Sequence, residues 1–145
     1  MTNASSLLLL ATLLCGCGAL DNCPDGQSEP IRITGRSSDP EGQLYVSAPW
    51  SSLDAFPAKT ALAFEHGLGF TPAVVLPYLS FAPVGTNDSE GGSVALSAGN
   101  QTLVDCVDSR VIVIRNDTCE EHFYIRVTAF GVGEDQEEAC SGPAE

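Results

Sequence analysis

The segment from His122 to Ala129 alternates strictly between polar and apolar side chains. This period of two is typical of a β-strand with one buried and one solvent-facing side. No segment after the first 16 residues keeps a helical period over three turns, which indicates an all-β chain. The residues that we expect to be buried are Phe123, Ile125, Val127 and Ala129, and their polar neighbours are His122, Tyr124, Arg126 and Thr128.

Short apolar segments separated by Gly, Pro, Asn and Asp recur along the rest of the chain. This pattern predicts an antiparallel β-sandwich of about eight short strands, with a barrel as the alternative. Pro77 lies inside one expected strand, so we place its middle at an edge or a bulge. The expected strands are Ile31–Arg36, Leu44–Ala48, Thr60–His66, Ala73–Ala82, Ser93–Ser97, Thr102–Cys106, Arg110–Arg115 and His122–Ala129.

The segment Arg110–Arg115 is apolar on both faces and ends in a charge at each side, as in a central strand of a sheet. Turn-forming residues follow it, from Asn116 to Glu121, before the alternating strand begins. We therefore predict that the two strands form a β-hairpin.

The N-terminus has the features of a secretion signal rather than of a fold element. The apolar run Leu7–Leu14 is too short to span a bilayer, which takes roughly 20 residues. The sequence Leu14-Cys15-Gly16-Cys17 after it resembles the lipobox of bacterial lipoproteins. The resemblance implies cleavage before Cys17, acylation of Cys17 and, because Gly18 follows, anchoring in the outer membrane of the cell envelope.

These signals divide the chain into four parts: a signal peptide (1–16), a lipidated tether (17–29), a β-sandwich domain (30–131) and an acidic C-terminal tail (132–145). The alternative is an ordinary signal cleaved after Ala19 and a secreted product. Under that alternative, four Asn-x-Ser/Thr triplets would suit glycosylation. The triplets begin at Asn3, Asn87, Asn100 and Asn116.

Four cysteines remain if Cys15 leaves with the signal and Cys17 carries lipid, and they allow three pairings. Cys106 and Cys119 flank opposite ends of a strand roughly 20 Å long, whereas a disulfide needs Cα atoms within about 7 Å. Cys140 follows the return strand and should lie near Cys106. We therefore predict the disulfides Cys106–Cys140 and Cys23–Cys119, formed in an oxidising compartment. The mature chain contains no Cys-x-x-Cys spacing, so the cysteines do not indicate a zinc site.

The chain has 19 acidic and 6 basic residues and a formal net charge of −13. Nucleic-acid binding and a polybasic membrane-binding surface are thereby excluded, because both need a basic face. We expect contact with a membrane through the lipid on Cys17 alone. Five acidic residues lie in the tail: Glu134, Asp135, Glu137, Glu138 and Glu145.

The sequence contains no motif of a nucleophilic hydrolase, a zinc protease or a phosphate-binding loop. We predict no catalytic, metal or cofactor residues and no enzyme activity. A small hydrolase would have only His66 and His122 as bases, and we interpret both as exposed residues at strand ends. Two sets of oxygen-bearing side chains could bind a cation, although an acidic surface in contact with water explains them as well. The first set is Asn87, Asp88 and Glu90, and the second is Asp105, Asp108, Asp117, Glu120 and Glu121.

Trp50 is the single tryptophan and follows Pro49 in a loop-like stretch. It is either a ligand contact or part of the core beside Leu53 and Phe56.

The segment Phe64–Leu76 resembles a strand, a Gly-Leu-Gly turn and a following strand of H-type lectin and phage-tail β-sandwiches. The segment Val111–Arg115, Asn116 and the segment Phe123–Gly131 together are similar to the closing hairpin of those domains. The resemblance implies an antiparallel sandwich that is often trimeric and often binds glycans or surfaces. No ligand residue carries over position by position.

Together these observations predict a lipid-anchored, non-enzymatic binding or adhesion module of the cell envelope, with a glycan or an envelope protein as partner. The alternative is a structural or accessory subunit of an envelope complex. A soluble secreted protein and a small hydrolase fit fewer of the observations.

Overall fold

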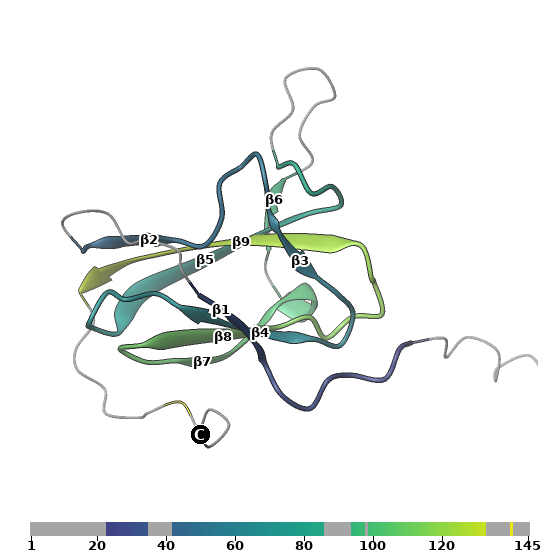
Figure 1. Cartoon of the computed structure of the whole chain (residues 1–145), viewed down its shortest axis with the longest axis horizontal. Helices are drawn as coiled ribbons and strands as arrows, with labels where there is room; N and C mark the ends of the chain where they lie inside the picture. The colour runs from purple at the N-terminus through teal and green to yellow at the C-terminus, as the bar shows by residue number, and fades with distance from the viewer. Residues whose placement is uncertain (1–22, 35–41, 86–93, 98, 133–139, 141–145) are drawn as a thin grey trace, which may run out of the picture.

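The computed structural model describes residues 23–34, 42–85, 94–97, 99–132 and 140. These residues form two facing β-sheets, the predicted all-β sandwich (Figure 1). The elements in chain order are β1 (Ile31–Ile33), β2 (Leu44–Val46), β3 (Asp54–Phe56), β4 (Ala61–Glu65), β5 (Pro72–Ser80), β6 (Ala95–Leu96), the 3₁₀ helix η2 (Gly99–Gln101), β7 (Leu103–Val107), β8 (Val111–Arg115) and β9 (Phe123–Val132).

The four-stranded sheet has the order β1-β4-β8-β7. β8 lies between β4 and β7, as expected for a strand that is apolar on both faces. β1 pairs with β4 in parallel, whereas the other strand pairs in the described residues are antiparallel.

The five-stranded sheet is built around β9, its longest strand. β5 pairs with one edge of β9, and β2 and β3 pair one after the other with its opposite edge. Ser47 bridges the two short strands, because its amide donates to Val127 O and its hydroxyl accepts from Val127 N, each at 2.9 Å. None of the expected strands covers β3, which lies between the expected strands Leu44–Ala48 and Thr60–His66.

The predicted hairpin between β8 and β9 is wrong. β8 belongs to the four-stranded sheet and β9 to the five-stranded sheet, so the two strands face each other instead of pairing. Both have one buried apolar face, and these faces meet across the sandwich. The residues between the strands span the distance from one sheet to the other, which is about 10 Å in packed sheets.

Pro77 does not interrupt the pairing of β5 with β9. Its carbonyl accepts a hydrogen bond from Ser97 N at 2.8 Å, on the edge that faces β6. The nitrogen and the carbonyl of a residue in an extended strand point to the same edge, so the missing N–H also faces β6. The proline therefore costs β5 no hydrogen bond to β9. β6 ends at Leu96, before the position that would pair with Pro77.

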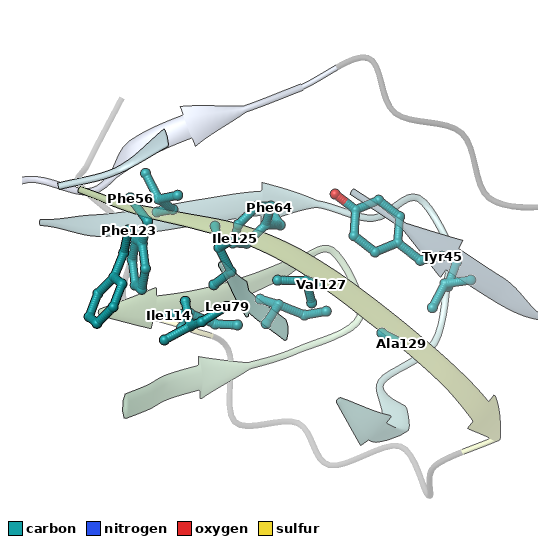
Figure 2. Packing of buried hydrophobic residues seen from close by; sticks show 12 residues of the cluster. Tyr45, Phe56, Phe64, Leu79, Ile114, Phe123, Ile125, Val127 and Ala129 are labelled. Atoms are coloured by element: carbon teal, nitrogen blue, oxygen red, sulfur yellow. The ribbon is translucent and has the colours of Figure 1, made fainter. Parts of the chain in front are cut away.

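The core fills the space between the two sheets (Figure 2). The predicted buried face of β9 supplies four of its side chains, and Ile112 and Ile114 of β8 face them. The remaining members come from other strands and the turn after β4: Tyr45, Phe56, Leu62, Phe64, Leu68 and Leu79. The burial of these side chains is the main source of stability of the sandwich.

Both predicted disulfides are present, Cys23–Cys119 and Cys106–Cys140, with Cα–Cα distances of 4.8 and 5.7 Å. The prediction of these pairs depended on the direction of β9, which does run back along β8. β9 belongs to the other sheet, however, and not to a hairpin with β8.

Candidate functional site

Trp50 lies on the outer face of the five-stranded sheet, in the loop between β2 and β3. Its ring centroid is 5.4 Å from that of Tyr78 on β5, with the rings at 80°. The Arg126 Cζ atom of β9 lies 4.0 Å from the centroid of the Trp50 ring. We call Trp50, Tyr78 and Arg126 the Trp50 cluster. All three side chains are half-buried, and none belongs to the core between the sheets.

Strand geometry explains why Tyr78 and Arg126 meet. Ile125 and Val127 are fully buried, so the alternation of β9 directs Arg126 to the outer face. Tyr78 is the register partner of Arg126 on β5 and therefore shares that face.

Gly85 fixes the position of Trp50 over this pair. Its amide donates to the Trp50 carbonyl at 2.6 Å, and Leu53 N donates to Pro83 O at 2.8 Å in the same region. A Cβ atom added to Gly85 would come within 2.9 Å of the Trp50 ring and 3.0 Å of Val94. Glycine at position 85 therefore lets the chain lie against the Trp50 ring without a clash.

Arg126 has no carboxylate partner among the described residues, although the chain is strongly acidic. Its Nε atom is buried and forms no hydrogen bond there. Burial lowers the pKa of Arg126, and the nearby Tyr78 opposes this shift. A guanidinium stays protonated at neutral pH, so the outer face carries a positive charge, and its buried Nε has no acceptor in the described protein.

One exposed apolar side chain lies beside the Trp50 cluster on the same face. Leu96 is the register partner of Tyr78 and is 55% exposed. Further along β9, Phe130 pairs with Leu44, and both are exposed. The outer face of the five-stranded sheet is thus apolar and aromatic around one cation, a composition typical of recognition surfaces.

His66 is fully buried, so our interpretation of it as an exposed strand-end residue is wrong. Leu68 N donates to its Nδ1 at 3.2 Å, and its Nε2 lies 3.0 Å from Asp108 O. The first bond makes Nδ1 the acceptor, so Nε2 carries the proton. Burial lowers the pKa of His66, while the Asp108 carbonyl and carboxylate oppose that shift. Both ring nitrogens bond to the backbone, and the residue acts as a structural link.

His122 is exposed, as expected, and its Nδ1 lies 3.2 Å from Glu120 Oε1. It precedes β9, whereas His66 lies beside the turn that joins β7 to β8. Since these positions lie at opposite ends of β8, the two histidines cannot act on one substrate bond.

Most of the acidic residues near β8 form hydrogen bonds or ion pairs within the protein, and Glu121 is exposed. Asp105 pairs with Arg115 at 2.7 Å and Asp117 with Lys59 at 3.0 Å. Within the described ranges, no group of three or more His, Cys, Asp or Glu side chains could hold a metal ion. Asn87, Asp88 and Glu90 lie outside the described residues.

Asp108 closes the turn between β7 and β8. Its Oδ1 accepts hydrogen bonds from Arg110 N and Val111 N, both at 2.7 Å, and its Oδ2 accepts from Cys140 N at 3.0 Å. Burial by itself would raise the pKa of Asp108, but these three bonds and the charge of Arg110 together lower it.

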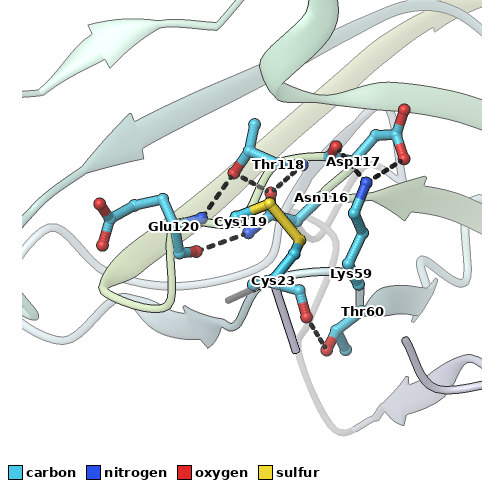
Figure 3. The surroundings of a disulfide bond; sticks show 9 residues. Cys23, Lys59, Thr60, Asn116, Asp117, Thr118, Cys119 and Glu120 are labelled. Carbon is cyan, nitrogen blue, oxygen red and sulfur yellow. Dashed lines mark hydrogen bonds and ion pairs between the residues drawn. A yellow bond between two sulfur atoms is a disulfide. The ribbon is translucent and has the colours of Figure 1, made fainter. Parts of the chain in front are cut away.

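Asn116 holds the loop that leads from β8 to β9 (Figure 3). Its Nδ2 donates to Phe56 O at 2.9 Å and to Glu120 O at 3.1 Å, and its Oδ1 accepts from the amide and the hydroxyl of Thr118. Asn116 is fully buried, so it is not accessible for glycosylation in the folded protein. This loop also carries Cys119, which is joined to Cys23.

Cys17, the signal peptide and most of the tail lie outside the described residues, and their roles remain predictions. No helix in the part of the chain that the structure describes is long and apolar enough to cross a membrane.

Comparison with known proteins identifies no relative, since no protein-family model, curated protein or solved structure matches the chain.

The sequence singled out Trp50 as a candidate contact but missed its partners, Tyr78, Gly85 and Arg126. Alternation in β9 was the available signal for Arg126, because it places this cation on the solvent-facing side. No local pattern indicates that Trp50 lies against it.

Proposed function

We propose that this protein is a lipid-anchored, non-enzymatic binding module of the cell envelope and that it binds its ligand through the outer face around Trp50. The Trp50 cluster is the observation that carries this proposal. A half-buried tryptophan packs against Gly85 and against a cation without a carboxylate partner in the described protein, and the exposed Leu96 lies on the same face. Aromatic side chains and arginine in such positions contribute most of the energy of many interfaces.

The Cys23–Cys119 disulfide supports the anchored arrangement. Cys17 precedes Cys23 by six positions, a distance of at most about 20 Å in a fully extended chain. A lipid on Cys17 would therefore hold the loop that contains Cys119 close to the membrane surface. Mass spectrometry of the intact protein tests this part, since acylated Cys17 supports it and an unmodified product that begins after Ala19 contradicts it.

Binding of the full chain to panels of glycans and envelope proteins tests the function itself. We expect specific binding that is lost on Trp50→Ala and kept on Val104→Ala, because Val104 is exposed on the other sheet. Absence of specific binding in both panels, or binding that survives Trp50→Ala in the folded protein, would contradict the proposal.

A second candidate function is an accessory subunit of an envelope complex. Exposed apolar side chains away from the Trp50 cluster favour it, in particular Phe81, which is 65% exposed, and the Leu44–Phe130 pair. Crosslinking in native membranes distinguishes the two functions. A constant crosslinked partner supports the subunit, and a monomer at every crosslinker concentration removes it.

A further inference from the structure

We propose that the Trp50 cluster binds an acidic sugar, a glycan unit that bears a carboxylate, and that Arg126 is the partner of this carboxylate. The proposal rests on the binding function above and names the class of ligand.

Arg126 differs from the other cations that the structure describes. Arg32, Lys59 and Arg115 each have a carboxylate oxygen within 3.4 Å, and Arg110 is exposed to water. Arg126 is half-buried, and no described carboxylate lies within ion-pair distance of it, in a chain with 19 acidic residues. Its buried Nε is one of three buried side-chain atoms in the described protein for which no hydrogen bond is found. The terminal N–H groups of a guanidinium without an ion-pair partner can be paired by an anionic ligand.

The net charge of −13 limits how many negative charges that ligand can carry. A polyanion would be repelled by the field of the whole protein before it reached Arg126. A single guanidinium binds a single carboxylate well, since its planar donors match the two oxygens of the carboxylate in a bidentate pair. We therefore infer a ligand with one carboxylate rather than a nucleic acid or an anionic membrane.

The aromatic side chains indicate that a sugar ring carries this carboxylate. Trp50 and Tyr78 are half-buried and lie at 80° to each other, so they form a corner beside the guanidinium. An aromatic ring offers a flat apolar surface to the C–H face of a pyranose, and the exposed Leu96 extends that surface on β6. A pyranose with a carboxylate can contact the corner and Arg126 together.

The position of Trp50 makes the test direct. It is the single tryptophan in the chain, so all tryptophan fluorescence reports on this cluster. The full chain is titrated with glucuronic acid and galacturonic acid, with their uncharged amides, and with acetate. We expect a saturable change for the acids, binding weaker by about tenfold for the amides, and no saturation by acetate over the same range.

Substitutions test the role of Arg126. Arg126→Gln should weaken binding of the acids by about tenfold and leave the amides unaffected. Arg126→Lys should keep part of the preference for acids, because the charge remains but the bidentate geometry is lost. Arg32→Gln is the matched control on the four-stranded sheet and should change nothing. Calorimetry of the same titrations confirms that the fluorescence change reports binding.

The outcomes separate this inference from the function on which it rests. Equal binding of acids and amides that still requires Trp50 would overturn the acidic ligand and leave the binding function intact. Acid binding unchanged in folded Arg126→Gln, or saturation by acetate alone, would overturn the inference as well. If no sugar binds here and none binds in the glycan and protein panels, both proposals fail. If Arg126→Gln does not fold, the comparison of acids with amides on the unsubstituted protein decides.

Discussion

The two ends of β8 are closed in similar ways by different chemistry. At one end, Asn116 uses its side chain to hold the backbone of a loop, and Cys119 of that loop is bonded to Cys23. At the other end, Asp108 holds the β7–β8 turn and the amide of Cys140, which is bonded to Cys106. We call these the Asn116 end and the Asp108 end.

The two ends differ in charge. The Asn116 end depends on a neutral amide, whereas the Asp108 end combines a carboxylate with the buried imidazole of His66. Hydrogen bonds of an amide do not change with pH, but those of Asp108 and His66 do. The Asn116 end should therefore be insensitive to acid, whereas acid should weaken the Asp108 end of the same sandwich.

Removal of the disulfides should have the largest effect. The Cys23–Cys119 bond joins residues 96 apart and the Cys106–Cys140 bond residues 34 apart. Chain entropy predicts losses of about 4.7 and about 3.8 kcal/mol in the free energy of unfolding when each pair is replaced by serine. Urea denaturation of the two double variants measures both values. A larger loss at the Asp108 end would contradict this order.

Asn116→Asp should destabilise the Asn116 end by about 2–4 kcal/mol. The substitution replaces a donor that faces Phe56 O and Glu120 O with an oxygen that repels both carbonyls. Chemical denaturation at neutral pH provides the measurement. Glu121→Gln, an exposed change in the same loop, is the control and should stay within about 0.5 kcal/mol of the unsubstituted protein. A loss below 1 kcal/mol for Asn116→Asp would show that the amide bonds are replaceable.

Acid should weaken the Asp108 end first. The pKa of His66 is lowered in the folded state, so the unfolded chain binds the proton more readily. Its contribution to the free energy of unfolding is complete above about pH 6.5 and declines as the pH falls below that value. The pKa of Asp108 is also lowered, and its contribution is lost only at a more acidic pH, below about 4.

Denaturation curves between pH 7 and pH 5 measure the His66 contribution. The decline should disappear in His66→Gln and persist in His122→Gln, since His122 is exposed and outside the turn. An unchanged pH dependence in folded His66→Gln would exclude His66 as its source.

Lys59→Met should have the smallest effect, at most about 1 kcal/mol. Lys59 Nζ contacts both the carbonyl and the carboxylate of Asp117 at the edge of the Asn116 end, but the ion pair is partly exposed. Thermal unfolding at low and high salt measures this contribution. A loss comparable to that of Asn116→Asp would mean that the exposed charges, not the buried amide, hold this end.

Alternation in the sequence predicted which side chains of β9 enter the core, because it determines the two faces of a strand. It could not determine which sheet a strand joins, and for this reason the β8–β9 hairpin prediction failed. The disulfides were still predicted correctly, since their pairing depends on strand direction, which is the same in both arrangements. β3 was missed because Asp54-Ala55-Phe56 contains one large apolar side chain directly before Pro57, so no alternation marks it as a strand.

The candidate site was less accessible to sequence analysis than the fold. Trp50 was recognisable as an unusual residue, but its contacts with Tyr78 and Arg126 depend on long-range pairing of β5 with β9. His66 was taken for a surface residue because it ends the expected strand Thr60–His66, whereas the fold buries it beside Tyr45 and the turn around Asp108. Such contacts come from tertiary packing, which local patterns do not encode.

The Cys23–Cys119 bond determines where a mechanical load would act on the domain. β1 is a three-residue strand at the edge of its sheet, and a pull on the chain ahead of it would otherwise separate it from β4 one hydrogen bond at a time. Because Cys23 precedes β1, the covalent bond transfers that force to Cys119, beyond the end of β8. Force on the N-terminal segment is therefore borne by the loop that joins the two sheets, and β1 stays unloaded.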